Sequence, residues 1–247
     1  MRKRALGITI AVLCAGFVAG VTGFAQDFQR TYKIAPDGII RVRSISGEVR
    51  IQGYDGPDIV VEGFRVGRNR DQVEIVDRST MNQVDVDVHY AENCNCDASV
   101  NFQVKVPRAV RYNFDHIGSI SGSVHLMDVT GNVRAESVSG SVEVKNVSGM
   151  VNASSVSGNV DVYIRRIEGS GEMKFSSISG NVVVRAPANL DADVAMSTLS
   201  GTLTTDFPIE IQERRYMPGR SARGRLGSGS LSIRITSVSG RVSLTKG

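Results

Sequence analysis

Side chains that could bind a metal ion gather between positions 85 and 96. Asp85, Asp87 and His89 alternate with valines, which places all three on one face of a strand. Cys94 and Cys96 follow, and His89 with two thiolates would supply ligands that Zn²⁺ or Cu²⁺ prefers. A half-buried strand presents polar residues to solvent in the same way, and no recognised ligand spacing is present. We therefore expect no metal site, with His89, Cys94 and Cys96 as the weak candidates.

Cys94 and Cys96 are also the only cysteines left once the N-terminal segment is set aside. In an oxidising compartment a local disulfide between them is the favoured interpretation, although the ring that it closes is small and strained. Two free thiols, an intermolecular bridge and half of a metal site are the alternatives.

A second group of chemically useful side chains is a basic segment near the C-terminus. Within residues 206–229 the arginines are Arg214, Arg215, Arg220, Arg223 and Arg225. Clustered guanidinium groups can dock phosphate, a sulfated glycan or lipid headgroups. The simpler interpretation is an exposed, soluble insertion of the kind that repeat folds tolerate. We take these five arginines as the candidate ligand contacts.

Motifs of common enzyme classes are missing. The sequence has no P-loop, no G-x-G-x-x-G after a strand and no G-x-S-x-G elbow. A β-helix glycosidase or polysaccharide lyase needs acids grouped on one coil face, and we expect no doublet in register among the acids of the repeats. Those acids are Asp128, Glu136, Glu143 and Asp161. The sequence therefore predicts no enzyme and no cofactor, with such a carbohydrate-active enzyme, or a metal-binding envelope protein, as the alternative.

The N-terminus carries the pattern of a secretory signal peptide. Arg2, Lys3 and Arg4 precede an uncharged, apolar stretch that ends at Ala25, the expected cleavage site. A retained membrane anchor is the alternative, because the stretch is long enough to span a bilayer. The whole chain has a net charge of +4, and removing three lysines and arginines and no acid leaves 26 against 25, or +1. We therefore expect an exported protein in the periplasm, on the surface or secreted, with no nucleic-acid partner and no transmembrane segment after cleavage.

A tetrapeptide of the form Ser-hydrophobic-Ser-Gly recurs through the chain. Its copies begin at Ser44, Ser119, Ser137, Ser155, Ser177 and Ser237, with a variant at Thr198. With weaker copies between them, glycines fall every nine residues from 122 to 158 and then every eleven to 180. Apolar residues stand two, four and seven positions after each glycine, and the first two offsets are strand periodicity.

One strong and one weak unit together predict a coil of 18 to 22 residues. Stacked coils predict an all-β fold, a β-solenoid or single-stranded β-helix-like stack of short strands, with valines inside and glycines at the corners. We expect the two serines of each strong corner to point outward and to flank an inward Val or Ile. An antiparallel sandwich is the alternative, but it would not require one tetrapeptide repeated in register.

Outside the repeats the pattern is less regular. Residues 26–117 contain irregular strands that predict either the first coils or an antiparallel cap. Regular repeats occupy 118–205, the Arg/Gly loop insertion 206–229 and the closing strands 230–247. After a signal peptide over 1–25, we expect residues 26–247 to form a single repetitive domain.

Taken together, these segments resemble the bacterial exported repetitive β-strand family known as "putative adhesin" domains of unknown function. The matching segments are Gly47–Asp55, Val104–Arg108, the tandem Ser-x-Ser-Gly strands, Gly227–Gly229 and Thr236–Gly240. The resemblance implies a β-solenoid-like stack of short strands and no established catalytic residues. It also implies a non-enzymatic, adhesin-like structural or binding protein of the cell envelope, whose partner is an envelope component, a glycan or a protein.

Overall fold

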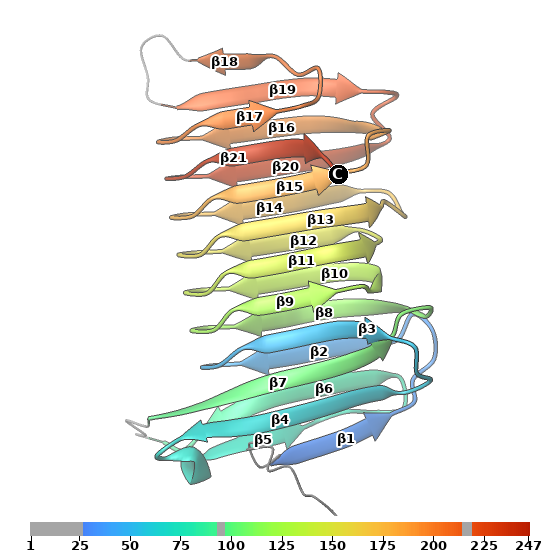
Figure 1. Cartoon of the computed structure of the whole chain (residues 1–247), viewed down its shortest axis with the longest axis vertical. Coiled ribbons are helices and arrows are strands. Elements are labelled where there is room, and N and C mark those ends of the chain that lie inside the picture. Colours follow the sequence, from blue (N-terminus) through green and yellow to red (C-terminus); the bar gives the residue numbers. More distant parts are fainter. Residues whose placement is uncertain (1–26, 93–96, 214–218) are drawn as a thin grey trace, which may run out of the picture.

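The computed structural model describes residues 27–92, 97–213 and 219–247, and this part of the chain is built almost entirely of strands. The strands stack into an elongated β-solenoid, as Figure 1 shows. The only helical element described is a single 3₁₀ turn, η1 (Arg70–Gln72). No helix in the described ranges is long and apolar enough to cross a membrane.

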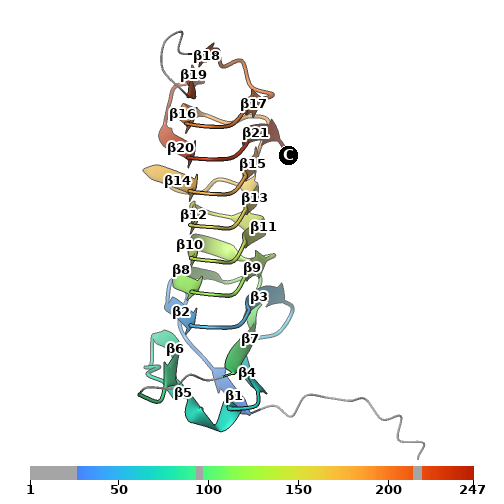
Figure 2. The same cartoon turned by 90° about the vertical axis from the view of Figure 1, so that its left-hand side faces the viewer.

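Each coil contributes one strand to each of two facing layers, which Figure 2 shows edge-on. We call them the back sheet and the front sheet. The coil strands of the back sheet are β2 (Ile39–Ser44), β8 (Arg111–Ser119), β10 (Thr130–Ser137), β12 (Val151–Ser155), β14 (Glu172–Ser177), β16 (Ala192–Thr198) and β20 (Leu231–Ser237). Those of the front sheet are β3 (Val49–Tyr54), β9 (Val124–Met127), β11 (Val142–Ser148), β13 (Val160–Arg166), β15 (Val182–Ala186), β17 (Leu203–Thr205) and β21 (Val242–Lys246).

The strand register confirms the predicted coil length. Val133 pairs with Val151 in parallel, a step of 18 residues, and Ala153 pairs with Phe175, a step of 22. Alternate side chains of both sheets point inward, so each rung adds valines or isoleucines to one continuous core. The core is thin, and Phe102, Phe114 and Phe175 are among its largest fully buried side chains.

The strong corners differ from the prediction. The first serine of each tetrapeptide is buried, as at Ser137 and Ser155, whereas the aliphatic residue that follows it is exposed, as at Val138 and Val156. The cause is the strand period of two, which continues inward through Val133, Ala135 and then the serine itself. The offset of seven from the glycine therefore marks an inward residue only at the weak corners.

The buried serine ties each corner to the next coil. Ser155 Oγ donates a hydrogen bond to the carbonyl oxygen of Gly140 in the neighbouring coil (2.8 Å) and accepts one from the N–H of Gly158 (2.9 Å). The glycines stack so closely that a Cβ atom on Gly158 would lie 2.1 Å from that same Gly140 oxygen. Glycine is thus required here by contact between backbones. The weak corner at Gly131 requires it both for a φ of +130° and for its contact with the backbone of Tyr112, whose oxygen would lie 1.8 Å from a Cβ atom.

Both predicted alternatives for the N-terminal segment occur. The strands β2 and β3 form a coil, and β6 (Gln83–Tyr90) and β7 (Ala98–Pro107) pair with them in parallel. Beyond these lies an antiparallel cap in which β4 (Ile59–Gly67) pairs with β7, β5 (Val73–Asp77) with β6, and β1 (Phe28–Tyr32) with β4. The cap covers the lower end of the stack in Figure 1.

At the other end the prediction was wrong in two respects. The strands β20 and β21 do not close the stack, because they lie between the coil of β14 and β15 and the coil of β16 and β17. The segment 206–229 is also not simply a loop. It contributes β18 (Ile211–Glu213) and β19 (Arg220–Leu226), and β19 pairs antiparallel with β16 at the upper end.

The corner hydrogen bonds predict a contrast between two serines of one tetrapeptide. Ser155→Ala removes the hydroxyl that serves two backbone groups and should lower the free energy of unfolding by about 1–3 kcal/mol. Ser157→Ala, at an exposed serine two residues on, should change it by less than about 0.5 kcal/mol. Urea unfolding of both variants measures the difference. Equal effects would show that the buried hydroxyl does not hold the coils together.

Candidate functional site

Seven aliphatic side chains form an exposed row along the edge where the strong corners stack. In order along the solenoid these are Ile45, Ile120, Val138, Val156, Ile178, Val238 and Leu199, and their exposed fractions range from 38% to 52%. Backbone hydrogen bonds join each corner to the next, for example from the N–H of Ser139 to the oxygen of Ile120 (2.8 Å). With strands about 4.8 Å apart, this corner ridge is roughly 29 Å long.

A groove runs beside the corner ridge on the outer face of the back sheet. It consists of four adjoining hollows of about 370 to 450 Å³ each, and neighbouring hollows share lining residues such as Ser154, Ser176 and Ser197. The hollows extend from Arg43 on β2 to Arg223 on β19. This back-sheet groove therefore crosses eight neighbouring strands, which corresponds to roughly 34 Å.

Five hydroxyl groups stand in one row on the floor of this groove. They belong to Ser154, Ser176, Thr236, Ser197 and Ser221, which are paired in register on neighbouring strands. All five side chains are partly buried, and none of their hydroxyls makes a hydrogen bond to another described residue. The buried corner serines differ, because their hydroxyls are bonded to glycine carbonyls. The outer row thus keeps its donors and acceptors for water or a ligand.

Basic side chains line the wall of the groove opposite the ridge. Arg134 pairs with Glu136 (2.7 Å), while Lys174 and Arg234 share one carboxylate, that of Glu172 (2.9 and 3.2 Å). Hydrogen bonds from Lys174 and, second, from Arg234 lower the pKa of Glu172.

Three of the predicted arginines lie in strand β19, and two of them reach the groove. Arg223 and Arg220 line it, with Arg220 also donating to the carbonyl of Gly201 (3.2 Å). Arg225 instead forms a two-point ion pair with Asp193 (2.7 and 3.0 Å), which lowers the pKa of Asp193. Arg214 and Arg215 lie outside the described residues.

The residues considered as metal ligands are not brought together in the part of the chain that the structure describes. Asp85 and Asp87 both pair with Arg43 (3.1 and 2.9 Å), and Asp87 also with Arg78 (3.5 Å). His89 is exposed, and in the described ranges no three His, Cys, Asp or Glu residues are placed to hold a metal ion. Cys94 and Cys96 lie outside the described residues, so their disulfide stays a prediction.

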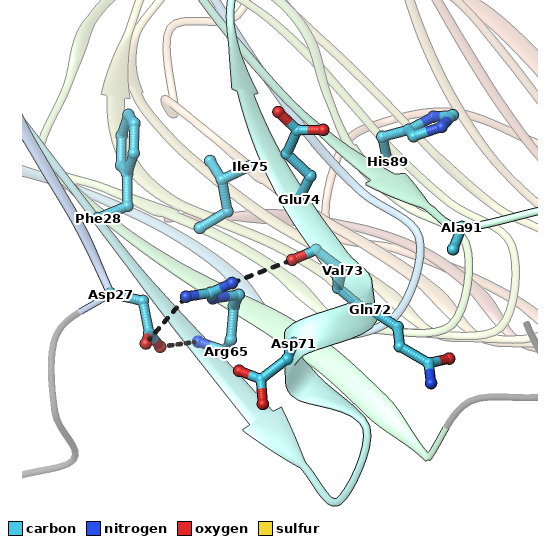
Figure 3. A pocket seen from close by; sticks show the side chains of 10 residues that line it. All are labelled: Asp27, Phe28, Arg65, Asp71, Gln72, Val73, Glu74, Ile75, His89 and Ala91. Carbon is cyan, nitrogen blue, oxygen red and sulfur yellow. Dashed lines mark hydrogen bonds and ion pairs between the residues drawn. The ribbon is translucent and has the colours of Figure 1, made fainter.

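His89 instead lines a hollow of about 600 Å³ in the N-terminal cap, shown in Figure 3. Arg65 lies at its centre and bonds to the carboxylate of Asp27 (3.4 Å) and the carbonyl of Val73 (3.3 Å). The backbone N–H of Arg65 donates to the same carboxylate (2.7 Å), so the visible bonds fix β1 against β4. Arg65 Nε is buried and has no hydrogen-bond partner among the described residues.

The acids of the repeats differ from the expectation in one place. Glu143 and Asp161 are direct neighbours in register on the outer face of the front sheet, so a doublet does exist. Each is paired with a cation: Asp161 with Arg185, and Glu143 with Lys145. His125 Nδ1 also forms a hydrogen bond with the carboxylate of Glu143 (2.9 Å). The hydrogen bonds from Lys145 and, second, from His125 lower the pKa of Glu143. A glycosidase needs a general acid whose pKa is raised, whereas the pKa of Glu143 is lowered.

Sequence reasoning missed the corner ridge and the hydroxyl row. Continuing the strand period past the inward residues that stand two and four positions after the weak glycine, such as Val133 and Ala135, would have placed the first serine inward and the following Ile or Val outward. The row itself follows from the residues directly before the buried Ser or Thr, such as Ser154 and Ser197, once the coils are in register.

The comparisons with known proteins can now be set beside this geometry. The family model described as Toastrack DUF4097 matches residues 40–245. The chain belongs to the Toastrack DUF4097 family. Comparison with the curated proteins finds no significant match.

Among solved structures, this Toastrack chain is similar to a "putative cell adhesion protein" from Clostridium sporogenes ATCC 15579, at 11% identity and a TM-score of 0.47. That likeness covers 89% of this chain and 99% of the other. A "putative adhesin" from Bacteroides fragilis NCTC 9343 is 12% identical, with a TM-score of 0.36 and coverage of 88% and 96%.

The lowered pKa of Glu143 predicts a pH-dependent loss of stability. Its ion pairs stabilise the fold above the ordinary glutamate pKa of about 4.3 and stop doing so as the pH falls through the lowered folded value. Glu143→Gln should therefore cost up to about 1 kcal/mol near pH 6, and the difference from the parent should vanish near pH 3. Urea unfolding at both pH values measures this. The control is Glu210→Gln, at an exposed carboxylate, and a pH-independent cost at Glu143 would contradict the assignment.

Proposed function

We propose that this Toastrack protein is an exported, non-enzymatic, adhesin-like protein that binds a component of the cell envelope along the corner ridge and the back-sheet groove. The proposal takes residues 26–247 as the mature module, after cleavage of the signal peptide predicted over 1–25. Family membership supports the fold, and the pattern of the N-terminal sequence supports export.

The observation that carries this proposal is the corner ridge. Aliphatic side chains exposed singly are ordinary, but contiguous exposed apolar patches mark interaction sites. Here seven consecutive coils each place an Ile, Val or Leu on the same edge, next to a groove with unsatisfied hydroxyls. The backbone ladder beneath fixes their spacing, so a partner meets a preorganised surface and binding orders little of the protein.

Co-sedimentation with envelope fractions tests the proposal. The exported full-length protein, purified from its host, is mixed with cell-wall sacculi and with membrane vesicles, and its N-terminus is determined by mass spectrometry. We expect an N-terminus after Ala25 and binding to one fraction that falls about tenfold in the triple variant Ile178→Asn, Val238→Asn, Leu199→Asn.

The matched control is Met81→Asn, because Met81 is 94% exposed and lies away from the ridge. Thermal unfolding should be nearly unchanged in both variants, since all four side chains are on the surface. An adhesin-like role at the ridge is rejected by equal binding of the triple variant and the control, or by no binding to any fraction.

A further inference from the structure

The back-sheet groove carries a larger net positive charge than the expected mature protein as a whole. Its three hollows nearest the C-terminal end are lined by five basic side chains, Arg134, Lys174, Arg220, Arg223 and Arg234, and by one acidic side chain, that of Glu136. Including Glu172, which pairs with Lys174 and Arg234, and setting aside Arg220, which has a further partner, four cations stand against two anions among the described residues, a net charge of +2. The expected mature chain carries only +1 in total. A partner of opposite charge is therefore drawn to this groove.

The side chains that line the groove form three parallel rows, each of one chemical kind. One wall is the aliphatic row of Val156, Ile178, Val238 and Leu199, and the floor is the row of five hydroxyls. The opposite wall is the basic row, in which Arg223 pairs with no described residue. Because the coils are in register, the aliphatic row and the hydroxyl row repeat at the spacing of the strands, about 4.8 Å. The basic row lies in the same register but skips two strands, where Asn152 and Ala195 take its place. A matching ligand is linear, repeats along its length and offers acidic, hydroxyl and C–H groups on different sides.

We propose that the groove binds a linear acidic polysaccharide, with its carboxylate or sulfate groups on the basic row, its hydroxyls on the serine and threonine row and its C–H faces on the corner ridge. The inference rests on the proposed function, because it names the ligand class for the same surface.

Two other linear partners fit less well. Single-stranded nucleic acid binds through bases stacked on aromatic side chains, and none of the described residues that line these hollows is Phe, Tyr or Trp. An extended peptide binds most readily by adding a strand to an open sheet edge, whereas the groove lies on a sheet face whose strands are already paired.

Calorimetry with three uronate polymers, polygalacturonate, alginate and hyaluronate, tests the inference. At low salt at least one should bind, its affinity should rise with chain length until the chain fills the groove, and added salt should weaken it. Carboxyl-reduced polygalacturonate should bind at least about tenfold more weakly, since it lacks the charges.

Two variants test separately what the basic row and the hydroxyl row contribute to binding. Lys174→Gln with Arg223→Gln should weaken uronate binding about tenfold, while the control Arg50→Gln with Lys105→Gln, the same charge change on the front sheet, should not. Replacing the hydroxyls by Ser176→Ala, Ser197→Ala and Thr236→Val should also weaken uronate binding about tenfold but leave polyphosphate binding unchanged. Thermal unfolding of each variant confirms that the fold persists.

Several outcomes overturn the inference. Equal binding of the reduced polymer indicates a neutral glycan, and an ineffective hydroxyl variant with strong polyphosphate binding indicates a general polyanion surface. If no uronate polymer binds while the protein still sediments with an envelope fraction in a ridge-dependent way, the ligand class is wrong and the proposed function stands. If neither binds, both fail.

Discussion

The whole solenoid depends on the contact between glycines at its strong corners. A Cβ atom on Gly140 would lie 2.1 Å from the Gly122 carbonyl oxygen, so the two coils reach their spacing only if the residue at this position has no Cβ atom. The buried serine completes the contact by donating to that carbonyl, from Ser137 at 2.9 Å. A buried carbonyl without such a donor would be costly, which explains why serine and glycine recur together in one tetrapeptide. Valine then fills the interior simply because the two sheets lie close together.

Vertical alignment of the backbone also organises the surface. Because each coil lies in register on its neighbour, equivalent positions of successive coils form rows on the outside. On the coil strands the aliphatic ridge comes from the second residue of the tetrapeptide, the hydroxyl floor from the residue just before the tetrapeptide, and the basic wall from two positions further back. Such rows need no aromatic anchor to be selective, because they present many weak contacts at one fixed spacing. The two ends differ, since the N-terminal cap and β19 lie antiparallel to their neighbours and so interrupt the repeat.

Much of the fold could be predicted from glycine spacing alone, including coils of 18 and 22 residues and the two-layer stack. The sequence analysis did not predict which corner side chains point inward. It placed Val138, seven positions after Gly131, in the core, whereas the strand period places Ser137 there. The stacking order was not predictable either. All copies of the tetrapeptide have the same shape, so the copy at Ser237 can stack on the one at Ser177 as well as the copy at Thr198 can. The groove could not be predicted either, because its basic side chains lie on strands that are distant along the chain and meet only through this stacking order.

The position of the last coil has a consequence for how the molecule is completed. The strands β20 and β21 separate two coils that are consecutive in the chain, as Figure 1 shows near the upper end. While the chain is being made from its N-terminus, the coil of β16 and β17 has no underlying neighbour until residues 231–246 emerge. The final residues therefore hold the coil of β16 and β17 on the rest of the stack, and a chain cut short before β20 would leave that coil unpaired with the coil of β14 and β15.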